Sequence, residues 1–246
     1  MYVDIHAHLD LVKNLDKVIQ RAKSKGITKI ITSGLETTTN KKALEIANKY
    51  DIVQASLSLF PRSVLRSENF KHWDYDIESE KEFIIQNKNK IVAIGETGLD
   101  YHWTGKKQEQ IELFNKVIEL SEDLNKPLIV HCRDAEKDVF EILKTTSKKD
   151  IVIHCYTGPL KLALDTNYFF SIPPAIVRMK NFQELARNIP LNKLLTETDS
   201  PFQSPLKHLR NEPCFVPKTI AKISELKKVD LERVRKVIYY NAIKLF

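Results

Sequence analysis

Cysteine is scarce in this sequence. Only three cysteines occur among its 246 residues, and these are Cys132, Cys155 and Cys214. An odd and sparse set is unlike the paired cysteines with which small secreted proteins build a disulfide framework. We therefore expect no such framework, and we expect a cytoplasmic location, where thiols stay reduced.

Long apolar runs and the common phosphate-binding loops are lacking as well. No stretch reaches the roughly 18–20 apolar residues that a membrane-spanning helix needs, so no membrane partner is expected. Asp4 and His6 interrupt the apolar start of the chain, which is unlike a secretory signal. Neither GxGxxG nor GxxxxGK[ST] occurs. No low-complexity block, linker or repeat divides the chain, so a single domain over residues 1–246 is expected.

The composition is that of a globular chain with an excess of positive charge. Hydrophobic residues make up 42% and charged residues 29%, which is enough for a sizeable core. The net charge of +7 favours a polyanionic partner such as nucleic acid, because basic side chains supply the sequence-independent part of nucleic-acid binding. Lysines that merely keep a surface soluble would give the same number, so both interpretations stay open. No obligate protein partner is predicted.

Short apolar runs alternate with longer amphipathic stretches along the whole chain. The runs are rich in Ile and Val, as are strands of a parallel sheet covered on both faces. They are VDIHAH (3–8), KIITSG (29–34), IVQASLS (52–58), IVAIGE (91–96), LIVHC (128–132), IVIHC (151–155), YFFSIP (168–173) and LLTETD (194–199). Amphipathic spacing predicts helices at Leu15–Lys25, Lys41–Tyr50, Gln108–Asn125, Asp134–Thr145, Asn181–Asn188 and Leu231–Leu245.

This alternation predicts an α/β fold, namely a (β/α)8 TIM barrel. The sixth unit is the poorest, since only about residues 160–166 remain for its helix. An open doubly wound sheet is the alternative, and the missing phosphate loops count against it.

Polar residues recur near the ends of the predicted strands. In a (β/α)8 barrel these ends converge on one mouth, where active sites lie. In the first strand, the spacing of His6 and His8 turns both rings to the same side. Cys132 and Cys155 each follow a histidine directly, so they should point away from the cavity and pack. The residues gathered at the mouth would be His6, His8, Glu96, His131, His154 and Asp199.

Each of these six residues has an ordinary structural explanation when it is taken alone. A single histidine in an apolar strand is usually a satisfied core residue, and a carboxylate can cap a helix or form a salt bridge. Together, however, they would place several costly buried polar groups at one end of one sheet. Four imidazoles and two carboxylates suit Zn²⁺ or Mn²⁺ and can also hold Mg²⁺. Six ligands favour two ions with a carboxylate between them, which predicts metal-assisted hydrolysis.

At these positions the sequence resembles the TatD family of metal-dependent deoxyribonucleases, within the amidohydrolase superfamily. The resemblance runs in order through DIHAH (4–8), GETGLDYH (95–102), PLIVHCR (127–133), IHCYTG (153–158), TDSPF (198–202), RNEP (210–213) and NAIKLF (241–246). It implies the same barrel and the same six metal ligands, with Glu96 bridging two divalent ions. It also implies that Asp199 binds metal and acts as general base on the attacking water.

The resemblance further implies that DNA is the substrate, cleaved by a 3′→5′ exonuclease of DNA repair and turnover. Arg133 and Arg210 are candidate phosphate contacts, because guanidinium binds phosphate through paired hydrogen bonds. Tyr101 and Trp103 follow the fourth strand and are candidates for stacking on bases. For all four residues a structural role, in a salt bridge or in loop packing, remains the alternative.

One segment departs from the family pattern. Where many members carry Gly-x-His-Pro after the third strand, this chain has SLSLFPR (56–62) and keeps only the proline. The missing histidine is not one of the six ligands. A same-fold hydrolase of a small phosphoester, or of another ester or amide, therefore stays open, as does a nucleic-acid-binding protein without catalysis.

Overall fold

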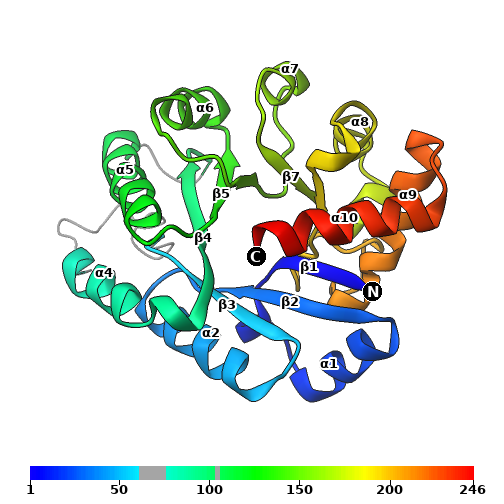
Figure 1. Cartoon of the computed structure of the whole chain (residues 1–246), viewed down its shortest axis with the longest axis horizontal. Coiled ribbons are helices and arrows are strands. Elements are labelled where there is room, and N and C mark those ends of the chain that lie inside the picture. The colour runs from blue at the N-terminus through cyan, green and yellow to red at the C-terminus, as the bar shows by residue number, and fades with distance from the viewer. Residues whose placement is uncertain (61–75, 103–105) are drawn as a thin grey trace.

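The computed structural model describes residues 1–60, 76–102 and 106–246, and its centre is a sheet of eight parallel strands (Figure 1). The strands pair in sequence order, each with the next. They are β1 (Tyr2–Ala7), β2 (Ile27–Ser33), β3 (Val53–Leu57), β4 (Ile91–Asp100), β5 (Leu128–Arg133), β6 (Ile151–Ile153), β7 (Phe169–Ile172) and β8 (Leu194–Thr196). The predicted (β/α)8 barrel is confirmed.

Helices surround this sheet, as Figure 1 shows. Their inner faces are apolar, and each buries that face against the strands, where burial of apolar surface stabilises the fold. They are α1 (Leu15–Ser24), α2 (Thr37–Lys49), α4 (Ile77–Gln86), α5 (Lys107–Asp123), α6 (Glu136–Thr145), α7 (Leu160–Leu164), α8 (Lys180–Asn188), α9 (Val216–Lys227) and α10 (Leu231–Leu245).

The barrel closes between its last and first strands. The hydroxyl of Thr196 donates a hydrogen bond to the carbonyl of Val3 at 2.7 Å, and the amide of Asp199 donates to the carbonyl of His6 at 2.9 Å. These bonds tie together residues that lie more than 190 positions apart in the chain.

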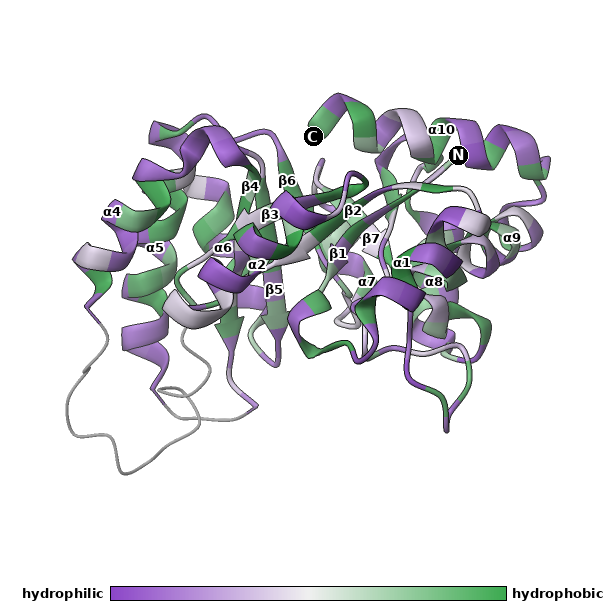
Figure 2. Ribbon diagram, turned by 90° about the horizontal axis from the view of Figure 1, so that it is seen from below, coloured by the Kyte–Doolittle hydropathy of each residue, from purple (hydrophilic) through white to green (hydrophobic). Residues whose placement is uncertain are grey.

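A second apolar cluster fills the barrel away from its mouth. It consists of Val3, Ile5, Ile31, Ala93, Ile129, Val152, Leu195 and Ala242. Seven of these residues come from strands, and Ala242 comes from α10, which lies across that end of the barrel (Figures 1 and 2). In Figure 2 the hydrophobic residues concentrate along the strands and on the helix faces turned towards them. A packed interior of this kind leaves only the opposite, C-terminal end open for a site.

The observed boundaries differ from the predicted ones in places that matter for the site. β4 continues past Glu96 to Asp100, while β8 ends at Thr196, so Asp199 lies beyond the strand. Helices α4 and α9 were not predicted. The apolar residues of α4 are bunched rather than spaced at helical intervals, and α9 begins with a proline in its first turn, where the missing amide costs nothing. Among the helices of the described residues, none has the length and apolarity to cross a membrane.

Candidate metal centre

The structure brings all six predicted ligands together at the C-terminal end of the barrel. His6 and His8 come from β1 and its end, Glu96 from the middle of β4, and His131 from β5. His154 and Asp199 follow β6 and β8. A cavity of about 430 Å³ opens at this place, and its walls include Glu96, His131, His154 and Asp199. The residues are deeply placed: Glu96 and His6 are fully buried.

Glu96 lies at the centre of the group. Its Oε2 is 3.2 Å from Nε2 of His6 and 3.1 Å from Nε2 of His8. Its Oε1 is 3.0 Å from Nδ1 of His131 and 3.4 Å from Nε2 of His154. The two oxygens of one carboxylate therefore face two different pairs of histidines, and they divide the centre into two halves.

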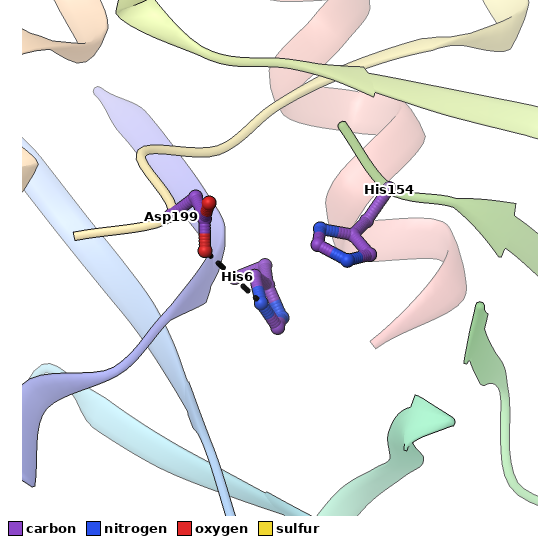
Figure 3. A group of neighbouring side chains, drawn as sticks. All are labelled: His6, His154 and Asp199. Carbon is purple, nitrogen blue, oxygen red and sulfur yellow. Dashed lines mark ion pairs between the residues drawn. The ribbon is translucent and has the colours of Figure 1, made fainter. Parts of the chain in front are cut away.

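Asp199 belongs to the half that contains His6 and His8. Its Oδ1 is 3.4 Å from Nε2 of His8 and 3.7 Å from Nε2 of His6. Figure 3 shows the carboxylate of Asp199 turned towards the ring of His6, with His154 on the other side of that ring. Asp199 adopts a left-handed backbone conformation with φ of 55°, which is uncommon outside glycine and turns its side chain into the centre.

The donor atoms suit divalent cations. Three overlapping groups place their ligand atoms within 4.8 Å of one another: His6, His154 and Asp199; His6, His8 and Glu96; and Glu96, His131 and His154. The buried Nε2 atoms of His6 and His8 form no hydrogen bond with any part of the chain that the structure describes. A buried polar atom without a partner is costly, and coordination of a cation would satisfy both nitrogens.

Polar residues behind the histidines hold the outer ring nitrogens. His6 Nδ1 is hydrogen bonded to Ser33 Oγ at 2.9 Å, and Ser33 is bonded to Ser56. On the other half, His131 Nε2 is 3.1 Å from Oδ2 of Asp100. Such contacts fix the ring orientation and leave the inner nitrogens free to face an ion.

Glu197 lies behind His154, but at a longer distance. Nδ1 of His154 is 3.5 Å from Oε2 of Glu197, and that oxygen accepts a hydrogen bond from Ser171 at 2.7 Å. Neither Asp100 nor Glu197 was predicted to be a site residue. Glu197 lies inside the predicted strand at 194–199, so a search for every charged residue of the predicted strands would have found it. Asp100 lies four residues past the predicted strand at 91–96, and only the observed length of β4 brings it to a strand end.

Burial and neighbouring carboxylates shift the protonation of the histidines in opposite directions. Burial, reinforced by the charge of His154, lowers the pKa of His6 to about 4. Burial would also lower the pKa of His8, but the nearby carboxylates of Asp199 and Glu96 outweigh it and raise that pKa to about 9. Burial would raise the pKa of Asp199, but the contact with His8 outweighs it and leaves that pKa below its usual value. Without a metal, protons thus balance the negative charge of the buried carboxylates. A bound cation would take the place of these protons.

Comparison with known proteins agrees with this geometry. The sequence model of the family described as "TatD related DNase" matches residues 3–246. The chain belongs to the TatD family. An uncharacterized metal-dependent hydrolase of Methanocaldococcus jannaschii is 38% identical, with 100% of this chain and 96% of that protein covered. A human deoxyribonuclease, TATDN3, is 31% identical, with coverage of 99% and 94%.

A solved structure shows the same fold. The TatD homologue YjjV from Escherichia coli superposes with a TM-score of 0.88 at 24% identity, covering 100% of this chain and 97% of that one. The chain is accordingly an enzyme, a metal-dependent hydrolase of the TatD family.

The predicted substrate contacts of this TatD protein differ in whether they reach the cavity. Arg133 borders the cavity, and Arg210 is exposed in the loop after β8. The hydroxyl of Tyr101 donates to Asp138 at 2.7 Å, and the ammonium group of Lys107 lies 4.4 Å from its ring centroid. Within the described residues, Tyr101 is not part of the cavity wall. Trp103 lies outside the described residues.

The segment that departs from the family pattern after the third strand also reaches the cavity. Of SLSLFPR (56–62), the structure describes residues 56–60, and Phe60 borders the cavity with its ring centroid 5.5 Å from that of His131. Cys132 and Cys155 both border the cavity. The packing role predicted for them is confirmed, since Cys132 belongs to the main apolar cluster and Cys155 packs against that cluster. Cys155 lies past the end of β6 and has a left-handed φ of 48°, so the alternation of side-chain directions along a strand does not apply to it.

Proposed function

We propose that this protein hydrolyses DNA phosphodiester bonds with two divalent cations, Mg²⁺, Mn²⁺ or Zn²⁺, as a 3′→5′ exonuclease. The relative named as a deoxyribonuclease and the description of the family support DNA as the substrate. The net charge of +7 is consistent with a polyanionic substrate.

The observation that carries this proposal is the division of the centre by Glu96. His6, His8 and Asp199 would hold one ion with Oε2 of Glu96, and His131 and His154 would hold the other with Oε1. A bound pair of ions supplies hydroxide at neutral pH and stabilises the leaving oxygen of the phosphodiester.

Asp199 would act as the general base. Its side chain is 12% exposed whereas that of Glu96 is fully buried, so of these two carboxylates Asp199 is the one that a water in the cavity can reach. The backbone bond from its amide to His6 fixes its position. Glu96 serves catalysis by holding both halves of the centre at a constant separation.

Arg133 is the cationic side chain best placed to contact the substrate, since it borders the cavity. A guanidinium there could bind the phosphate next to the scissile bond through two parallel hydrogen bonds. Arg210, on the exposed loop, would contact a more distant phosphate. Of the two residues predicted to stack on bases, Tyr101 is engaged by Asp138 and Lys107, and Trp103 lies outside the described residues.

Hydrolysis of a small phosphoester, or of another ester or amide, is the second candidate. It is favoured by the altered segment SLSLFPR, because Phe60 of that segment borders the cavity. Relatives called only metal-dependent hydrolases are compatible with it as well.

The test uses protein stripped with a chelator and reloaded with Mg²⁺, Mn²⁺ or Zn²⁺. Its substrates are 5′-labelled single- and double-stranded DNA and p-nitrophenyl phosphoesters. We expect metal-dependent shortening of the labelled strand in single-nucleotide steps, and loss of cleavage in Asp199→Asn. Turnover of the phosphoesters without DNA cleavage would refute the proposal in favour of the second candidate.

A further inference from the structure

Phe202 is an exposed aromatic residue in the wall of the catalytic cavity. It lies three positions after Asp199, and 46% of its surface is exposed. Its ring centroid is 6.3 Å from that of His8, with the two ring planes at 68°. The cavity that contains Glu96 and Asp199 is bordered by Phe202 as well. An exposed aromatic ring thus lies beside the proposed metal ligands.

The exposure of Phe202 does not come from a loose loop. Its amide donates a hydrogen bond to the carbonyl of Asp199 at 2.7 Å. Its neighbour Pro201 accepts a bond from the amide of Asn211 at 3.0 Å, and the side chain of Arg178 donates to the carbonyl of Ser204 at 3.0 Å. The backbone on both sides is therefore fixed, and it holds a large apolar side chain partly in water, where it gains little stability for the fold.

The other aromatic side chains near the centre are already engaged. Phe60 is only 2% exposed and packs against the ring of His131. Tyr101 is bonded to Asp138 and covered by Lys107. Of the two phenylalanines that border the cavity in the described chain, Phe202 is the exposed one and so is accessible to a ligand.

We propose that Phe202 stacks on a nucleobase adjacent to the scissile phosphodiester and so determines specificity for nucleotides over simple phosphoesters. The histidines and carboxylates of the cavity, with the ions they would hold, can bind a phosphate, whereas Phe202 offers an exposed aromatic side chain to a base. Stacking on an aromatic ring recognises every base, because each has a π-face. This inference rests on the proposed function, since it names the group that the same site recognises beside the phosphate.

The experiment compares two strands of equal length, oligothymidylate and a strand of abasic tetrahydrofuran residues, with Mn²⁺-loaded enzyme. Phe202→Ala should raise KM for oligothymidylate about 5–150-fold, the range expected for the loss of one base–aromatic stack. It should leave KM for the abasic strand unchanged, because that strand has no base to stack. Phe202→Tyr should restore the wild-type KM.

Leu206→Ala is the matched control. Leu206 is on the same loop, is 54% exposed and is not in the cavity wall of the described structure, so its removal should change neither KM. An equal effect of Phe202→Ala on both strands, or no effect on either, overturns the inference while the proposed nuclease function stands. If the wild-type enzyme cleaves neither strand, the proposed function fails and this inference fails with it.

Discussion

Asp100 should set the affinity of one half of the metal centre. It is 7% exposed, and its Oδ2 lies 3.1 Å from the outer nitrogen of His131. A hydrogen bond to a charged group contributes about 1.5–3 kcal/mol, against about 0.5–1.5 kcal/mol for a neutral one. Asp100→Asn keeps the shape of the side chain, but the hydrogen bond to His131 becomes weaker by about 1–1.5 kcal/mol. The affinity for the ion at His131 and His154 should therefore fall by roughly tenfold. Asp100→Ala loses the whole contact and should weaken that ion by about 10–100-fold.

The assay is a titration of metal-free protein with Mn²⁺ or Zn²⁺ against a competing chromogenic chelator, which gives both affinity and stoichiometry. The fold should persist, because the main-chain groups of Asp100 keep their bonds to Gln110, at 2.7 Å and 3.0 Å. Asp138→Asn is the control, since that carboxylate accepts from Tyr101 and does not contact the centre. Wild-type affinity for both ions in Asp100→Ala, or equal weakening of both, would contradict the division of the centre into two halves.

Three further predictions address the centre and the strands around it. Glu96→Gln should abolish hydrolysis and lower the affinity for both ions, because this one side chain faces both halves of the centre. An unchanged circular dichroism spectrum would exclude unfolding as the cause. Gly98→Ala should lower the free energy of unfolding in urea by about 2–4 kcal/mol. The reason is that an added Cβ would lie 2.0 Å from the carbonyl oxygen of His131 on the neighbouring strand. An unchanged free energy of unfolding would show that β4 can move away. Cys132 and Cys155 should react with iodoacetamide at neutral pH far more slowly in the native than in the unfolded protein, because burial raises the pKa of both thiols; similar rates would refute this.

The sequence was sufficient to predict the barrel and to gather six residues at its mouth, because apolar runs and strand ends are local features. It could not predict how the backbone aims those residues. Ile5 belongs to the apolar cluster inside the barrel, and strict alternation would turn its neighbour His6 away from that interior. The pairing of β1 with β2 is irregular between Asp4 and Ala7, and such an irregularity re-aims the side chains that follow.

The same limit applies on β4. The pairing of β4 with β5 shifts between Gly95 and Thr97, the point at which Glu96 enters the centre. The positive φ of 139° at Gly95, and the 2.6 Å that would separate an added Cβ from the carbonyl of Ile129, explain why glycine stands there. These adjustments depend on the neighbouring strand, which a pattern within one segment does not contain.

The helix across the closed end of the barrel has a consequence for biosynthesis. Ala242 belongs to the interior apolar cluster, and Tyr239, Leu245 and Phe246 pack against it. The first strand emerges from the ribosome long before these residues are made, yet Val3 cannot acquire its complete surroundings until α10 has been translated. Because contacts between β1, β8 and α10 join the two ends of the chain, folding should finish only after synthesis of α10, and until then the apolar interior of the barrel would stay incompletely covered.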